Sequence, residues 1–133
     1  MEKIQANLVL EILGRPKENV SESLFLLTEK LSKEPGTKII HKKLHEPIPL
    51  ESSKDLFTSF AEITLEFDKI ENYFAVIFAY MPANIEIISP QSFEVEKDLL
   101  TEVGNRLLQR LHNYDAIAKK MLGKGIFVTP GSV

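Results

Sequence analysis

The chain has 133 residues, no cysteine, 44% hydrophobic residues and a formal net charge of −3 at pH 7. This length supports one domain with a hydrophobic core, without help from disulfides or a metal. The missing cysteines exclude disulfide and thiolate chemistry, and the negative charge argues against a general nucleic-acid binder, which has to neutralise many phosphates. No stretch approaches the ~20 apolar residues that span a bilayer, and no signal peptide is evident at the start, so we expect a cytoplasmic protein without membrane contact.

The first half of the chain predicts a strand, a helix and a second strand. Residues 4–13 alternate in character, which is typical of a strand with one apolar face. Pro16 suits the first turn of the helix, which Pro35 and the following glycine close. Thr37–Leu44 predicts the second strand, whose lysines suit a sheet edge, and residues 46–53 predict a polar loop with two prolines. The stripe of the helix consists of Val20, Leu24, Leu27 and Leu31.

The middle of the chain contains the most hydrophobic segment. Residues 57–67 alternate and predict the longest strand. Asp68, with a glutamate three residues later, is a helix start signal, and the helix predicted over 70–81 is apolar on nearly its whole surface. Pro82 ends this helix, and residues 85–88 predict a short strand. We expect such a helix to be buried on two sides, by a sheet on one side and by either the last helix or another subunit on the other. Its clearest stripe consists of Ile70, Phe74, Ile77 and Met81.

A long amphipathic helix is predicted over residues 97–122. Its acidic residues lie early and its lysines late, which matches the helix dipole. Gly104 costs this helix about 1 kcal/mol relative to alanine, which is explained either by a close approach to another element or by simple tolerance. Residues 123–133 form a tail, with a short strand or a docking arm around Phe127. The apolar stripe of the helix consists of Leu100, Val103, Leu107, Leu111, Tyr114, Ala118 and Met121, widened by Leu108 and Ile117.

The predicted order is therefore strand, helix, strand, strand, helix, strand, helix. The first six elements form the split βαβ pattern of a ferredoxin-like domain, in which two helices back a four-stranded antiparallel sheet. We expect an α+β, ferredoxin-like βαββαβ fold with an added long C-terminal helix. The prediction places it in a single domain over residues 1–122, followed by the tail.

No residue pattern indicates a catalytic, cofactor or metal site. His41 and His45 are four residues apart in a strand, a separation of about 13 Å, which is too far to share one ion with Glu46. His112 is expected at the surface or in packing rather than as a general base. RNA binding through Phe57 and Phe60 is disfavoured, because aromatics three apart in a strand point to opposite faces.

One loop could contact an anion. Arg15 and Lys17 stand at a strand-to-helix junction, where backbone amides and basic side chains can hold an anion, as an acylphosphatase-type site on this fold would. The glycine-rich phosphate cradle of that family is missing, and Pro16 removes one amide. Helix initiation with solvated basic side chains is therefore the favoured interpretation.

The segment Tyr80 to Leu111, YMPANIEIISPQSFEVEKDLLTEVGNRLLQRL, resembles the end of the C-terminal extension of WYL-type transcriptional regulators. In those proteins too, a helix leads into a short strand, a proline-bearing loop and a final helix. The resemblance implies a ferredoxin-like fold and a role in assembly, although the chain lacks their DNA-binding helix-turn-helix and their WYL residues. The whole chain is also similar to small, stand-alone archaeal proteins of ferredoxin-like fold. Neither resemblance transfers a functional residue.

The surplus of apolar surface leads to a functional hypothesis. We expect a non-enzymatic interaction or assembly module that self-associates as a dimer, because the helix over 70–81, the last helix and the tail exceed what one sheet needs to bury. Alternatively, the last helix covers the second sheet face of a monomer. The second hypothesis is a regulatory domain that senses a small molecule at the interface between sheet and helix or at the dimer interface. No cofactor is expected, and another protein remains an alternative partner. The candidate interface residues are Tyr73, Phe78, Tyr80, Gly104, Tyr114 and Phe127.

Overall fold

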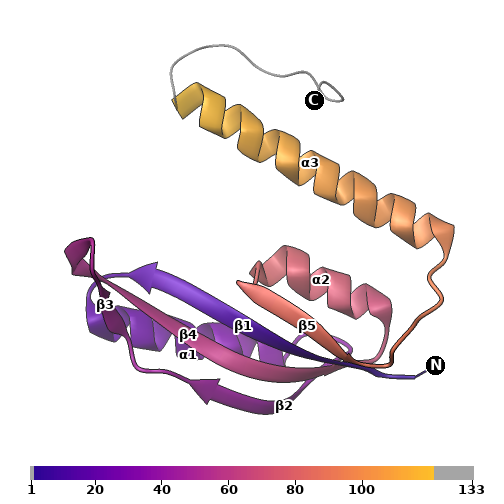
Figure 1. The fold of residues 1–133 in the computed structure, drawn as a ribbon, viewed down its shortest axis with the longest axis horizontal. Coiled ribbons are helices and arrows are strands. Elements are labelled where there is room, and N and C mark those ends of the chain that lie inside the picture. Colours follow the sequence, from indigo (N-terminus) through magenta and orange to yellow (C-terminus); the bar gives the residue numbers. More distant parts are fainter. Residues whose placement is uncertain (1, 122–133) are drawn as a thin grey trace. The chain divides into compact units, whose positions relative to one another are not determined.

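The structure is a computed structural model that describes residues 2–121. It is an α+β protein with a five-stranded antiparallel sheet and three helices (Figure 1). The chain divides into two compact units, one ending at Phe93 and the other beginning at Glu94. The elements are β1 (Ile4–Gly14), α1 (Lys17–Ser32), β2 (Thr37–Leu44), β3 (Ile48–Leu50), β4 (Ser53–Phe67), α2 (Ile70–Tyr80), β5 (Asn84–Ser89) and α3 (Lys97–Met121).

The sheet is built around the pairing of its two longest strands. β1 pairs with β4 in an antiparallel register that runs from Ile4↔Phe67 to Gly14↔Phe57. The strand order is β2-β4-β1-β5, and β3 pairs with the beginning of β4. Each strand–helix–strand crossover therefore spans one intervening strand: β4 lies between β1 and β2, and β1 lies between β4 and β5. The basic strand β2 lies at an edge, which confirms its predicted position.

The core lies between one face of this sheet and the helices α1 and α2. Alternate residues of β1 and β4 point to the same face because the register pairs them directly. Successive turns of α1 each contribute a buried side chain to this core. The polar Thr28 is accommodated there because its hydroxyl donates to the backbone oxygen of Leu24 at 2.9 Å. The sheet residues buried here are Ile4, Ala6, Leu8, Leu10, Ser59, Ala61, Ile63, Leu65 and Phe67, and the α1 residues are Val20, Leu24, Thr28 and Leu31.

The structure contains one strand that the sequence did not predict. Residues 46–53 were expected to form a loop, but Ile48–Leu50 forms β3 and β4 already begins at Ser53. Pro49 is tolerated because β3 pairs on one side only, so no neighbouring strand needs the amide that proline lacks. Proline is therefore a weaker strand breaker at this edge than the sequence reasoning assumed.

The start of α2 also differs from the prediction. Lys69, not Asp68, is the N-cap residue, and its backbone amide donates to Asn72 Oδ1 at 3.1 Å. The Asp68 carboxylate instead faces Lys3, with an Nζ–Oδ1 distance of 3.4 Å. That contact is the main reason why the pKa of Lys3 is raised. The D-x-x-E pattern therefore located the start of the helix to within one residue but named the wrong capping groups.

The buried face of α2 is a second correction. The predicted stripe ended at Met81, but Met81 lies beyond the helix in a left-handed conformation, with φ of 45°, and is 58% exposed. Phe74 and Ile77 are only half-buried. Because α2 is apolar on nearly all sides, its sequence period does not determine which face meets the sheet. The buried residues are Ile70, Val76, Phe78 and Tyr80.

Candidate functional site

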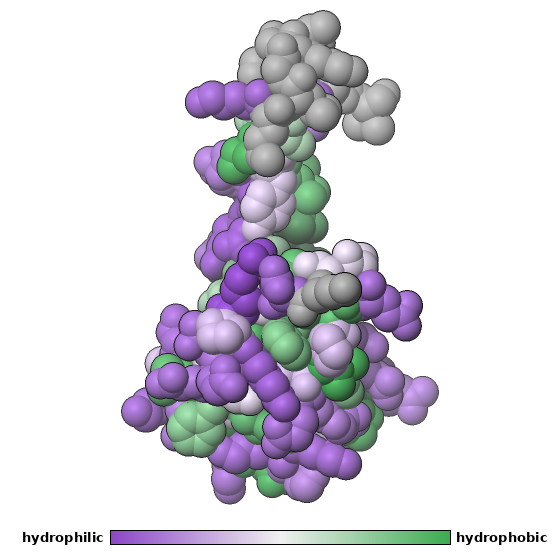
Figure 2. Space-filling model, turned by 90° about the vertical axis from the view of Figure 1, so that its left-hand side faces the viewer, coloured by the Kyte–Doolittle hydropathy of each residue, from purple (hydrophilic) through white to green (hydrophobic). Residues whose placement is uncertain are grey.

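Among the described residues of its unit, the helix α3 carries the most extensive apolar surface. Its 25 residues begin with an acidic first turn and end with a basic last turn. Between them, large apolar side chains recur every three or four residues and leave about half of their area in solvent. In Figure 2, α3 shows green residues along one flank and purple residues along the other. The exposed fractions are Leu100 53%, Leu107 48%, Leu108 52%, Leu111 51%, Tyr114 46% and Ile117 56%.

The spacing of this surface is that of a coiled-coil seam. The central positions alternate in steps of four and three residues, which is the pattern that keeps a helix face toward a partner over several turns. Leu108 lies on one side of this row, and Val103 and Ile117 lie on the other. We call the row of six and its three flanking residues the α3 stripe. The row consists of Leu100, Gly104, Leu107, Leu111, Tyr114 and Ala118.

Gly104 leaves a gap in the α3 stripe. A Cβ atom added there would meet no heavy atom within 4 Å. The other glycine of interest, Gly36, has φ of +64° and a hypothetical Cβ only 2.5 Å from Asn72 Oδ1. Glycine is therefore required at position 36 by the backbone conformation and by the closeness of Asn72. Among the described residues, no neighbouring atom requires a glycine at position 104.

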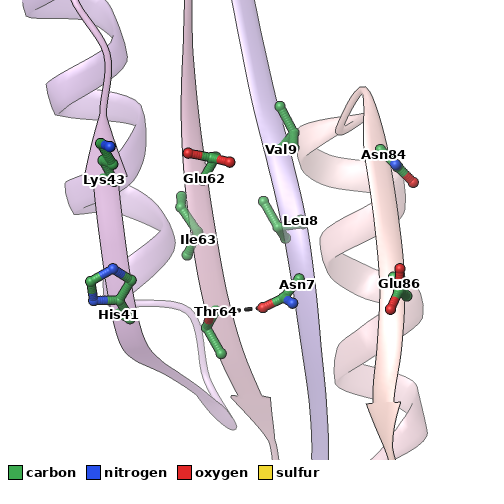
Figure 3. Close-up of a pocket in the computed structure, with 10 residues that line it drawn as sticks. All are labelled: Asn7, Leu8, Val9, His41, Lys43, Glu62, Ile63, Thr64, Asn84 and Glu86. Carbon is green, nitrogen blue, oxygen red and sulfur yellow. Dashed lines mark hydrogen bonds between the residues drawn. The ribbon is translucent and has the colours of Figure 1, made fainter.

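A second candidate site lies on the face of the sheet that α1 and α2 do not cover. Figure 3 views this open face, with the helices behind it. The face is hollowed over a volume of about 350 Å³, and its exposed side chains are mostly polar. Thr64 donates to Asn7 Oδ1 at 2.7 Å across the two central strands. The remaining polar or charged groups around the hollow are His41, Lys43, Glu62, Asn84 and Glu86.

At one end of the open face, His45 makes several contacts with residues of β4. Its Nε2 lies 2.7 Å from Glu62 Oε2, and its ring stacks on Phe60 with 4.1 Å between centroids. The hydroxyl of Ser59 donates to the His45 backbone oxygen at 2.6 Å. His45 thus has structural partners. Among residues 2–121, no group of three His, Asp or Glu side chains is placed to hold a metal ion.

The predicted interface residues are distributed over different environments. Phe78 and Tyr80 are buried in the N-terminal unit, at 8% and 9% exposure. Tyr73 is half-buried and lies edge-on to Phe67, with 6.1 Å between ring centroids. The two predicted interface residues on α3, Gly104 and Tyr114, belong to the α3 stripe. Phe127 and the tail over 123–133 lie outside the described residues.

The buried side chain of Tyr80 connects two elements of the N-terminal unit. Its hydroxyl donates to Glu34 Oε1 at 2.6 Å and so links the end of α2 to the end of α1. The ammonium of Lys30 lies 5.8 Å from the Tyr80 ring centroid. Burial, and secondly the neighbouring Glu34 carboxylate, raise the pKa of Tyr80 well above its usual range. This tyrosine is therefore a neutral hydrogen-bond donor that ties two helices together.

The two residues predicted to contact an anion lie at the start of α1. Arg15 and Lys17 are exposed on either side of Pro16, whose backbone oxygen accepts from the Asn19 and Val20 amides. Pro16 is the N-cap residue and makes no side-chain capping bond. The observed contacts account for the initiation of the helix, and the residues near Arg15 include the carboxylate of Asp55.

The apolar positions of α3 are evident from the sequence, but its exposed leucines are not among the predicted interface residues. The 4-3 spacing would have identified Leu100, Leu107 and Leu111. The open face was missed as a possible site because its residues come from four strands, and their proximity follows only from the pairing register.

These features define a protein with a helix-backed antiparallel sheet and a long amphipathic helix that follows it in the chain. The chain belongs to the MJ0538 family, whose model matches residues 5–120. The match thus extends from β1 to the last turn of α3. No curated protein and no solved structure matches the chain. Among the described residues, no helix combines the length and apolarity needed to cross a membrane.

Proposed function

We propose that this protein is a non-enzymatic interaction module that forms a homodimer through α3. The observation that carries the proposal is the α3 stripe, whose six large apolar side chains are each about half exposed. Contiguous apolar surface of this kind marks interaction sites, because its exposure to water is unfavourable. Apolar residues scattered singly over a surface carry no such meaning. A helix cannot cover its own stripe, and most of the stability of a helix in a protein comes from packing of its apolar face.

The open sheet face is a poor cover for an amphipathic helix. The open face carries the apolar side chains of Val9, Leu13 and Phe60, but it also carries the carboxylates of Glu11, Glu62 and Glu66 on β1 and β4. Burying these carboxylates under a leucine-rich surface would remove them from water without a compensating partner. A second α3 stripe, in contrast, is apolar along its whole length, which favours the dimer over the monomeric alternative.

The size of the stripe indicates how strong the dimer should be. Complete burial of a leucine contributes about 1.5–3 kcal/mol, so covering the exposed half of six such side chains on each of two helices contributes on the order of 10 kcal/mol. Association costs about 4–15 kcal/mol in lost freedom of motion. We therefore expect a reversible dimer whose population depends on concentration, rather than a permanent one.

Several finer assignments belong to this proposal. Each βαβ unit of the sheet is split by a strand of the other unit, which supports a ferredoxin-like class with β3 as an added edge strand. A role in assembly also agrees with what the resemblance to WYL-type extensions implies. The absence of cysteine supports a cytoplasmic location.

The dimer is tested by multi-angle light scattering over a range of protein concentrations. Wild-type protein should approach twice the monomer mass, and Leu107→Asp should remain monomeric because a carboxylate cannot be buried in the seam without a partner. Leu26→Asp is the matched control, because Leu26 is an equally exposed leucine (56%) on α1. It should dimerise like the wild type. A wild-type protein that stays monomeric into the hundred-micromolar range contradicts the proposal.

The hollow of the open face favours one alternative function, a domain that senses a small polar molecule. Its volume of about 350 Å³ is at the lower end of the range for small-molecule sites, which begins near 300 Å³. A ligand bound there should raise the melting temperature. The test is a thermal-shift screen with polar metabolites, in which any effect must disappear in Lys43→Ala. A screen without a Lys43-dependent shift removes the support for this alternative.

A further inference from the structure

We infer that two α3 helices pair antiparallel, with Leu107 of each helix packed against the partner's Leu111. This inference rests on the proposed homodimer and specifies its orientation and register. It is argued from the order of large and small residues in the α3 stripe and from the distribution of charge along the helix.

The sizes of the residues in the stripe are complementary only when one helix is reversed. In the antiparallel register, Gly104 faces the partner's Tyr114, and Ala118 faces the partner's Leu100. Every small residue thus meets a large one, and the two-fold axis passes at the level of Gln109. In a parallel pair, Gly104 would face its own copy and leave a void, whereas two Tyr114 rings would compete for one layer. Packing at native density favours the antiparallel arrangement.

The flanking residues extend the apolar contact in the same register. Reversal of one helix places Val103 on the same side of the seam as the partner's Ile117. On the other side, Leu108 lies beside the partner's Leu108. The three flanking residues that widen the stripe therefore all acquire apolar neighbours. The pairing is isologous, because both copies use the same surface, as closed dimers do.

Charge favours the same orientation. Residues 94–102 carry four acidic side chains and one lysine, whereas the last turn of α3 carries Lys119 and Lys120. An antiparallel pair brings the acidic first turn of each helix to the level of the partner's basic last turn, and it opposes the two helix dipoles. A parallel pair aligns the dipoles and brings acid to acid and lysine to lysine. The ends of the helix therefore attract in one orientation and repel in the other.

Engineered cysteines test the orientation directly, because the natural chain contains none. Leu100→Cys and Ala118→Cys variants are oxidised with oxidised glutathione, separately and as an equimolar mixture. The antiparallel register predicts a disulfide-linked dimer in the mixture and almost none in either variant alone, because positions 100 and 118 lie about 27 Å apart along the helix. Self-linkage of Leu100→Cys alone would establish a parallel pair and overturn the inference.

The same samples separate failure of the orientation from failure of the dimer. If light scattering shows dimers but the mixture forms no disulfide, the antiparallel register is wrong and the proposed homodimer stands. If light scattering shows monomers, both proposals fail. Each cysteine variant is measured in reducing buffer first, so that a loss of the dimer caused by the substitution itself is recognised.

A size exchange tests the register independently. Gly104→Leu should weaken the dimer at least tenfold, because leucine would collide with the partner's Tyr114, although leucine is the better helix former. Adding Tyr114→Ala to the same chain makes room for that leucine and should restore the dissociation constant to within about threefold of the wild type. Additive effects of the two substitutions would contradict the pairing of these positions.

Discussion

The two units of the chain use leucine in opposite ways. In the N-terminal unit, Leu8 on β1 and Leu24 on α1 are each 1% exposed, because strand and helix cover one another. On α3, Leu107 and Leu111 recur with equally regular spacing but are 48% and 51% exposed. An amphipathic pattern therefore specifies which face of an element has to be covered, but it does not specify whether the cover comes from the same chain. The comparison is what makes α3 the candidate for an intermolecular contact.

The largest difference between the units should appear when a leucine is removed from each. Leu65→Ala deletes a fully buried side chain from β4 and should lower the free energy of unfolding by about 2–5 kcal/mol. Leu107→Ala should leave the unfolding of the N-terminal unit almost unchanged and weaken the dimer instead. Urea denaturation followed by β-sheet circular dichroism, at a concentration too low for dimers, measures both variants. Equal losses would show that α3 contributes to the same core.

The two glycines sharpen the comparison at a smaller scale. Gly36→Ala should destabilise the protein by about 2 kcal/mol, because φ is +64° and the new Cβ would displace Asn72. The Asn72 side chain donates to the Pro35 backbone oxygen at 3.1 Å, so the turn and the start of α2 are disturbed together. Gly104→Ala should instead stabilise α3 by up to about 1 kcal/mol. Thermal unfolding of both variants, followed by helical circular dichroism, distinguishes them, and equal effects would contradict this distinction.

The smallest expected effect concerns pH and the N-terminal unit alone. The pKa of Tyr80 is raised in the folded state, so its contribution to stability is fully present below the unfolded pKa of about 10 and is lost as the pH rises further. Wild-type protein should therefore lose stability above pH 10 more steeply than Tyr80→Phe. Urea midpoints of both proteins between pH 8 and pH 11 measure the difference. A constant difference over this range would show that Tyr80 ionises equally in both states.

Much of the fold could be predicted because its signals are local. Alternation located β1 and β4, and Pro82 ended α2 within two residues of its observed end at Tyr80. β3 was missed because Pro49 within it and Pro47 before it argue against a strand, although an edge position removes that objection. The buried face of α2 was misplaced because a helix that is apolar all round carries no directional period. What failed was therefore information that depends on neighbours in space.

The candidate sites divide in the same way. The α3 stripe follows from the period of one continuous helix, so the sequence could reveal its apolar positions, although not their exposure. The open face requires Asn7, His41, Thr64 and Glu86 from four strands, which only the pairing register brings together. Tyr80 and Phe78 were predicted at an interface because the helix over 70–81 has a surplus of apolar surface, whereas in the structure both side chains are buried in the N-terminal unit.

The lysines of β2 have a consequence for how far assembly can proceed. Lys38, Lys42 and Lys43 occupy the outer strand of the sheet, whose free amides and carbonyls would otherwise template the addition of strands from further molecules. Positive charge repeated along this edge makes a second copy of the same strand an unfavourable neighbour. Growth into ribbons or fibres is thereby opposed at β2, and a two-fold helix pair uses up its own contact surface. The lysines of β2 therefore oppose one route by which the proposed dimer could grow into larger assemblies.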